Sequence, residues 1–173
     1  MEIRNLGESD AAEYQALRLR ALREAPEAFG STYAEEVDRP LDGIAAQLAG
    51  RGPGGGFVLG VAHLRGGALM GVAGCYREAG FKRRHAGVVW GMFVAPEARG
   101  AGAGGALLDA LLAQARDWPA LEQLTLSVVP ENTVARALYV SRGFRSFGLA
   151  PRALRDEARY YDLEYLWFPL DAG

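Results

Sequence analysis

The sequence predicts a mixed α/β (α+β) fold in which a mostly antiparallel central sheet is flanked by helices. Strand patterns cluster in the centre of the chain, where hairpin signals join them. Helix patterns precede this cluster and then alternate with strands towards the end. The length of 173 residues and a hydrophobic content of 50% fit one core of ordinary size. We therefore expect a single domain that spans residues 1–173.

The N-terminal part of the chain predicts one strand followed by helices. Asp10, with Glu13 three residues on, is typical of a helix N-cap, and Pro26 stops the helix that follows. The expected elements are a strand over 1–6, a helix from 10 to about 24, and one or two short helices within 27–50, near 33–37 and after Pro40.

The centre of the chain predicts an antiparallel meander. Residues 51–56 form a loop, because five of these six residues are Gly or Pro. Two strands follow, over 57–64 and 68–77, and Gly66-Gly67 between them is a hairpin signal. A third strand covers 85–94. These three strands are the middle of the predicted sheet.

The second half of the chain alternates helices with strands. The leucines of the first helix recur on one face, and Pro119 ends it. Alternating Leu124, Leu126 and Val128 predict a half-buried strand. The expected elements are a helix over 102–118, a strand over 121–129, a short helix over 132–141, and strands over 144–149 and 160–170.

The overall charge and the cysteine content exclude several classes of function. A net charge of −2 gives no basic surface for nucleic acid or anionic membranes, so neither is an expected partner. The single Cys75 lies among apolar residues, so we expect a buried thiol and no intrachain disulfide. No metal-ligand spacing occurs, and no signal pattern or membrane-spanning apolar run is found, so we expect a cytoplasmic protein without metal.

The most informative segment is VAPEARGAGAGG, over residues 94–105. A predicted strand ends there, glycines follow, and a helix begins. Glycines allow a ligand to approach the backbone closely. The first turn of a helix offers unpaired N–H donors and a partial positive charge. Together these features predict an anion site that suits a pyrophosphate group.

Two other interpretations of this segment are open. Gly100, Gly102 and Gly105 match the dinucleotide-binding pattern G-x-G-x-x-G. That pattern normally follows its strand directly in a parallel βαβ unit, whereas here residues 95–99 intervene and hairpins precede. The next strand, over 124–129, carries no acid for the ribose. The remaining alternative is that the glycines only form a tight turn.

Two motifs in this half of the chain resemble those of one enzyme family. The run RGAGAG at 99–104 resembles the Arg/Gln-x-x-Gly-x-Gly/Ala signature of the GCN5-related N-acetyltransferases (GNAT). PENTVARALY at 130–139, followed by Gly143-Phe144, resembles the second motif of that family. The motifs cover about residues 86–148. The resemblance implies the acyl-CoA N-acyltransferase fold, acetyl-coenzyme A as co-substrate, and transfer of its acetyl group to an amine.

The resemblance also implies roles for particular residues. The glycine loop would hold the pyrophosphate, and a tyrosine at position 139 would donate to the departing thiolate. Asn132 would contact the cofactor arm and also cap its helix. The implied cofactor-binding residues are Met92, Phe93 and Val94 through their backbone, then Arg99, Gly100, Ala101, Gly102, Ala103 and Gly104 of the loop, then Asn132, Ala135 and Tyr139.

The general base is not carried by the motifs. Many relatives have a carboxylate on the strand before the glycine loop or on the next strand, but 85–94 has none and Ser127 stands at the second place. Glu35, Glu78 and His85 are the candidates, with Glu35 and Glu78 preferred, although each also suits a solvated surface position. A base acting through water, or no base at all, stays open.

The acceptor amine is not identified by the sequence. Residues 26–40 and 78–85 are expected to form its pocket. Glu35, Glu36 and Asp38 could attract a cationic amine there, or could simply be a solvated helix face. A non-catalytic acyl-CoA-binding or regulatory module of the same fold is the alternative function. The oligomeric state is open, with a homodimer among the alternatives.

Overall fold

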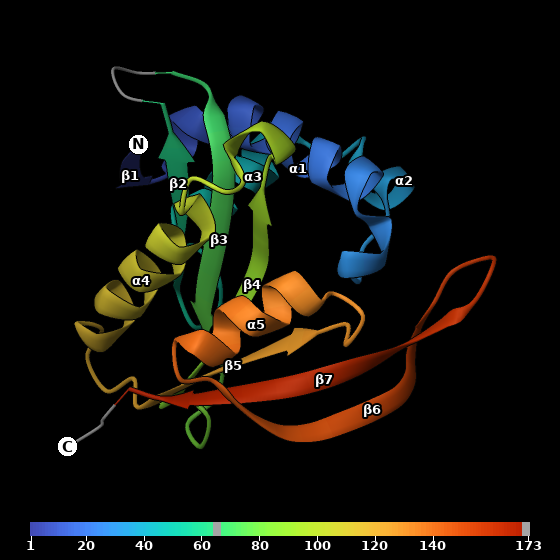
Figure 1. Ribbon diagram of the computed structural model, residues 1–173. Helices are drawn as coiled ribbons and strands as arrows, with labels where there is room; N and C mark the ends of the chain where they lie inside the picture. The colour runs from blue at the N-terminus through green and yellow to red at the C-terminus, as the bar shows by residue number, and fades with distance from the viewer. Residues whose placement is uncertain (64–66, 171–173) are drawn as a thin grey trace.

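The computed structural model describes residues 1–63 and 67–170, and it contains one seven-stranded sheet. The strand order is β1-β2-β3-β4-β5-β7-β6 (Figure 1). Every neighbouring pair is antiparallel except β4 and β5. The strands are β1 (Glu2–Asn5), β2 (Gly56–Ala62), β3 (Leu69–Arg77), β4 (Ala86–Val94), β5 (Gln123–Val128), β6 (Arg145–Arg155) and β7 (Tyr160–Pro169). The expected mixed, mostly antiparallel fold is therefore confirmed.

Helices cover both faces of this sheet (Figure 1). They are α1 (Ala11–Glu24), α2 (Tyr33–Glu36), α3 (Leu41–Leu48), α4 (Ala103–Arg116) and α5 (Thr133–Ser141), with short 3-10 turns η1 (Glu8–Asp10), η2 (Pro26–Ala28) and η3 (Pro96–Ala98). Leucines of α4 pack against one face of the strands, in the expected helical pattern. The helices α1 and α3 pack against the other face through Tyr14, Leu17 and Ile44. The sheet thus lies between two hydrophobic cores.

The central meander is present, with β2 and β3 paired antiparallel. Leu64 and Gly66, at the expected end of the first strand and its hairpin turn, lie outside the described residues. Cys75 of β3 is fully buried, and burial raises the pKa of its thiol to about 12. No helix within the described ranges is long and apolar enough to cross a bilayer.

Asp10 stands at the expected N-cap position of α1, but its side chain makes no capping hydrogen bond to that helix. The 3-10 turn η1 precedes α1, so Asp10 has helical rather than extended backbone angles. Its carboxylate accepts the Gly7 N–H at 2.7 Å and pairs with Arg4. The Glu13 carboxylate accepts the Leu69 N–H at 2.7 Å, on the neighbouring strand β3. Neither acid therefore forms the expected capping box at the start of α1.

Strand β6 is longer than the expected 144–149. It continues to Arg155, where it pairs with Tyr160 of β7. Most of its side chains are exposed, so its far half has no alternation of apolar and polar residues. A sequence pattern reports burial, and this hairpin extends beyond the core, as Figure 1 shows.

Candidate active site

Strands β4 and β5 separate beyond a short stretch of pairing. They pair in parallel from Ala86–Gln123 to Val88–Thr125, at the beginning of both strands. No further pairs join them within the described chain, although β4 continues to Val94 and β5 to Val128. The two strands therefore leave a gap in the sheet at their C-terminal ends.

A β-bulge turns the backbone of β4 at this gap. Val72 of β3 pairs with Phe93 and Gly74 pairs with Trp90, so two residues of β4 oppose one residue of β3. Gly91, one of the two, has a φ of +64°, which favours glycine. A Cβ atom at Gly91 would meet nothing within 4 Å. The bulge therefore turns the backbone of β4 and leaves open space beside Gly91.

The residues beside the bulge divide between the two faces of the sheet. Met92 and Val94 pack against the core that contains α4. Phe93 is buried in the other core, with α1 and α3, and Trp90 packs against that same core. The side chain of Phe93 thus stabilises the fold, which leaves its backbone for the contacts that the motif implies.

The glycine loop leads from β4 into α4. Arg99 Nε donates to the Val94 carbonyl oxygen at 2.9 Å and so anchors the start of the loop. Gly100 and Gly102 have φ values of +76° and +81°, and Gly102 is the N-cap of α4. The first turn of α4 contains no acidic residue. Its unpaired N–H groups and dipole therefore favour an anion.

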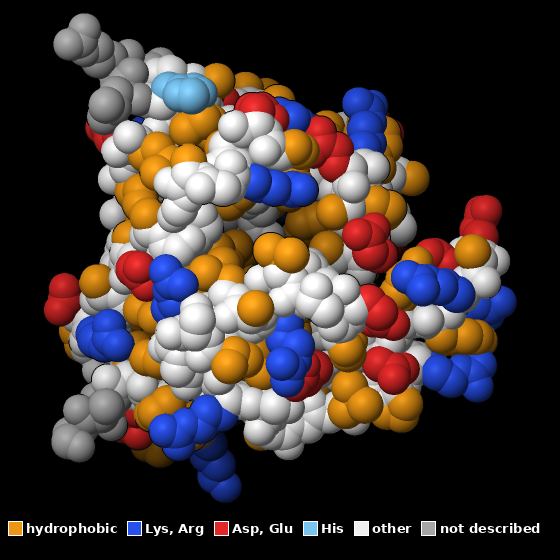
Figure 2. All heavy atoms as spheres, viewed as in Figure 1, with side chains coloured by type: hydrophobic (Ala, Val, Ile, Leu, Met, Phe, Trp, Pro, Cys, Tyr) orange, Lys and Arg blue, Asp and Glu red, His pale blue; other side chains and the backbone are white. Residues whose placement is uncertain are grey.

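Gly104 of α4 is the point where three segments meet. A Cβ atom added there would lie 3.4 Å from Leu138 Cδ2 of α5. It would lie 3.7 Å from Val94 Cγ2 and 3.8 Å from Met92 Cε, both on β4. The structure therefore brings together the strand, the glycine loop and the second motif. In the same view as Figure 1, the surface is hollowed between the η3 segment and α5, with hydrophobic atoms in the hollow (Figure 2).

Helix α5 holds the two side chains that the second motif singles out. The Asn132 side chain caps the helix by accepting the Ala135 N–H at 3.2 Å. Tyr139 is 8% exposed and packs edge-to-face on Phe144, with ring centroids 5.9 Å apart. Burial raises the pKa of the Tyr139 hydroxyl to about 12, so the phenol is neutral at physiological pH. No protein group among the described residues hydrogen-bonds to this hydroxyl.

Of the three candidate bases, Glu35 is engaged in a helix cap, and Glu78 and His85 lie at the paired end of β4. The Glu35 carboxylate accepts the Thr32 N–H at 2.7 Å in a capping box of α2. That backbone hydrogen bond lowers the pKa of Glu35. The Glu78 N–H donates to the Ala86 carbonyl, and His85 precedes Ala86, so both residues lie at the paired end of β4.

The acidic residues at α2, namely Glu35, Glu36 and Asp38, differ in burial. Glu36 is buried and forms an ion pair with Arg18 at 2.7 Å. Burial raises the pKa of Glu36, but the Arg18 hydrogen bond and charge more than offset this effect, so the pKa is lowered. Glu36 therefore joins α1 to α2 and does not attract an amine, whereas Glu35 and Asp38 are exposed.

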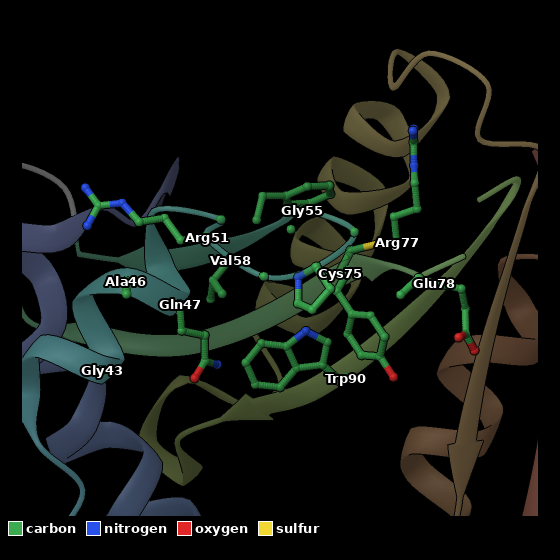
Figure 3. Close-up of a pocket in the computed structure, with 18 residues that line it drawn as sticks. Gly43, Ala46, Gln47, Arg51, Gly55, Val58, Cys75, Arg77, Glu78 and Trp90 are labelled. Atoms are coloured by element: carbon green, nitrogen blue, oxygen red, sulfur yellow. The ribbon is translucent and has the colours of Figure 1, made fainter. Parts of the chain in front are cut away.

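A cavity of about 590 Å³ lies on the α3 side of the sheet (Figure 3). We call it the Trp90 cavity. The Trp90 ring lies on Gly74, where an added Cβ would come within 2.4 Å of the indole. The motifs do not predict this pocket, although a glycine within a strand, as at Gly91, is a signal of a bulge. The lining is Gly43, Ala46, Gln47, residues 50–58, residues 75–79 and Trp90.

Comparisons with known proteins agree with this architecture. The model of the acetyltransferase (GNAT) family matches residues 17–144. A GNAT acetyltransferase from Streptococcus pneumoniae superposes with a TM-score of 0.85 at 22% identity, over 97% of this chain and 98% of that chain. YncA, a putative acetyltransferase from Salmonella typhimurium solved with acetyl-CoA, gives 0.84 at 22% identity, over 100% and 95%. A ribosomal-protein-alanine N-acetyltransferase from Brucella melitensis gives 0.79 at 26% identity, over 98% and 99%.

The fold and the glycine loop define an acyltransferase architecture, with a split sheet and an anion-binding helix. The family match covers most of the chain. This chain belongs to the GNAT family of acetyltransferases.

Proposed function

We propose that this chain transfers the acetyl group of acetyl-CoA to a primary amine, by direct attack in a ternary complex. The acceptor is a small molecule or an amine of a peptide or protein. The observation that carries the proposal is the meeting of β4, α4 and α5 at Gly104, beside the gap in the sheet. Family membership supports the same reaction.

The residues present fit coenzyme A. A Cβ atom at Gly100 or Gly102 would meet nothing within 4 Å, so phosphate oxygens have room beside the loop backbone. The helix dipole contributes about 0.3–1 kcal/mol, and N–H groups of the loop supply further hydrogen bonds. We propose that residues 99–104 hold the pyrophosphate, and that Asn132, Ala135 and Tyr139 of the second motif line the cofactor arm.

The bulge supports the step in which negative charge develops. Bound acetyl-CoA supplies an acetyl group activated as a thioester. We propose that backbone groups of Met92, Phe93 and Val94 orient this arm, and that an N–H group of this segment donates to the developing oxyanion. The bulge disturbs regular pairing with β3 at this point, and so re-aims such donors.

Tyr139 supports departure of the thiolate as a hydrogen-bond donor. Its pKa of about 12 exceeds that of an ordinary thiol, ~8.5, by roughly 3 units, so full proton transfer would cost about 4–5 kcal/mol. A hydrogen bond to the thiolate carries no such cost. The neutral phenol is therefore suited to donate a hydrogen bond and retain its proton.

Proton loss from the amine is best supported through water. Glu35 has a lowered pKa, which makes it a weak base, and it is already engaged by Thr32. Glu78 lies opposite Ala86, about 16 Å along β4 from Gly91. We therefore propose that the attacking amine loses its proton to water, and that neither carboxylate acts as the base.

An acceptor screen tests the proposal. Purified protein is mixed with acetyl-CoA and a panel of polyamines, aminoglycosides, amino acids and N-terminal peptides, and release of free thiol is followed. Amine-dependent release supports an N-acetyltransferase. Binding of acetyl-CoA without release with any amine supports the alternative, a non-catalytic acyl-CoA-binding module, which the lack of a carboxylate on β4 favours.

We further propose that residues 1–173 act as one domain, because both hydrophobic cores share one sheet. A cytoplasmic location, the absence of nucleic-acid and membrane partners, and a homodimer as one alternative stay predictions from the sequence.

A further inference from the structure

We infer that the Trp90 cavity binds the body of the acceptor, and that this acceptor is an elongated amine with an apolar or aromatic segment and a second positive charge that contacts Glu78. The inference rests on the proposed function, which it deepens by naming the class of acceptor. Three features of the cavity carry it: its aromatic wall, its position beside the bulge, and the location of its one carboxylate.

The wall of the cavity is aromatic and flat. Gly74 has no side chain, so the Trp90 indole lies directly on strand β3. Tyr76, two residues on, is 43% exposed and lines the same space. A volume of about 590 Å³ is in the range of small-molecule sites. Methylene chains and aromatic rings pack well on such surfaces, and cations are attracted to their faces.

The near end of the cavity lies next to the bulge. Trp90 is the residue of β4 that lines the cavity, and Gly91 follows it directly. The space around a Cβ at Gly91 is empty to 4 Å. An amine attached to a group packed on Trp90 therefore has room beside the turned backbone of β4. Figure 3 shows Trp90 with the Gln47 side chain of α3 extending towards it.

The far end of the cavity carries Glu78. The Glu78 N–H donates to the Ala86 carbonyl oxygen at 2.9 Å, so Glu78 lies beside Ala86. Ala86 precedes Gly91 by five residues on β4, which corresponds to about 16 Å. This distance is several times the reach of a glutamate side chain. Glu78 is therefore better placed to bind a distal group of the acceptor than to deprotonate the attacking amine.

Glu78 is the charged lining residue most available to a ligand. Its Arg83 partner is 71% exposed and lies 3.4 Å away, and such surface pairs contribute little. Arg51 pairs with Glu8, while Arg77 donates to the Pro119 carbonyl at 2.5 Å and stacks on Trp118. In Figure 3 the head groups of both arginines point away from Trp90. The negative charge of Glu78 thus sets the preference for a cation at this end.

A length series of acceptors tests the inference. Linear terminal diamines, from butanediamine to dodecanediamine, are compared with monoamines of the same length, by thiol release and by calorimetric binding in the presence of coenzyme A. We expect kcat/KM for diamines to rise with length until the second charge reaches Glu78. At that length the diamine should exceed its monoamine by about threefold to fivefold.

Variants separate the two ends of the cavity. Glu78→Gln should abolish the advantage of the diamine while leaving the monoamine unchanged. Glu2→Gln, an exposed acid on β1, is the matched control and should keep the advantage. Trp90→Leu should raise KM for both series about tenfold, and Tyr76→Leu, at an exposed position, gives a second test if Trp90→Leu does not fold.

The outcomes separate this inference from the proposed function. If thiol release does not depend on the length of the diamine, or if Glu78→Gln leaves the advantage of the diamine unchanged, the inference is wrong while the proposed function stands. Absence of thiol release with every amine overturns the function. In that case calorimetry still decides the inference, because length-dependent diamine binding that Glu78→Gln removes supports it and the lack of such binding overturns it.

Discussion

The two faces of β4 are built in different ways. On the α4 face, glycines, backbone N–H groups and a helix N-terminus surround the gap in the sheet. On the α3 face, the Trp90 cavity is walled by side chains from three strands and a helix. A backbone site depends on a short run of sequence, whereas a side-chain cavity depends on packing between distant segments. The first is therefore suited to a constant co-substrate and the second to a variable acceptor.

The hydroxyl of Tyr139 provides the largest test of the α4 face. Tyr139→Phe keeps the ring and its packing on Phe144, so folding and acetyl-CoA affinity should hardly change. Turnover should fall about 100-fold, since the lost interaction is made in the transition state. Steady-state kinetics with an identified amine measure this effect. Equal turnover in both proteins, with chemistry rate-limiting, would leave Tyr139 a purely structural residue.

Binding of acetyl-CoA should stabilise the fold by mass action. At 100 times its dissociation constant the expected gain is about 2.7 kcal/mol. Thermal unfolding with and without the ligand measures it, and adenosine without the phosphates serves as the control. If the glycine loop is only a tight turn, the midpoint will not move.

Gly102 tests whether the loop works through its backbone. Its φ of +81° is unfavourable for a branched residue, so Gly102→Val should cost about 1–2 kcal/mol of stability and weaken acetyl-CoA binding more than tenfold. Gly43→Ala is the matched control on α3, where an added Cβ meets nothing within 4 Å. Wild-type affinity in a folded Gly102→Val protein, measured by titration calorimetry, contradicts the proposal.

The smallest expected effect concerns the loss of folding stability at low pH, to which one ion pair on each face of the sheet contributes. Arg18 pairs with Glu36 beside α1, and Arg136 pairs with Glu164 beneath α5. The pKa of Glu36 is lowered despite burial, and that of Glu164 is lowered mainly by its hydrogen bond to Arg136. Both contributions are complete above pH 4.5, the ordinary value, and are lost as the pH falls through the lowered values. Glu164→Gln should flatten this decline in melting temperature below pH 4.5, and an unchanged slope would exclude the pair as a cause.

The sequence predicted the α4 face far better than the α3 face. Glycines at 100 and 102 indicate a positive φ from the local sequence alone, so the sequence predicts the loop at its observed position. The contact between Gly74 and Trp90 depends on the register between β3 and β4, including the bulge, which no local pattern indicates. The Asp10 carboxylate makes no capping bond for a different, local reason, because it binds the Gly7 N–H and the Arg4 guanidinium instead. The part of the site that the sequence does not predict is thus the part that depends on strand register.

The short pairing between β4 and β5 also affects where the sheet opens most readily. Only three residue pairs, from Ala86–Gln123 to Val88–Thr125, join β4 to β5, fewer than join any other neighbouring strands of the described chain. This short pairing is the junction between β1 to β4 and β5 to β7, and hydrogen exchange should find the least protected amides of the sheet along it.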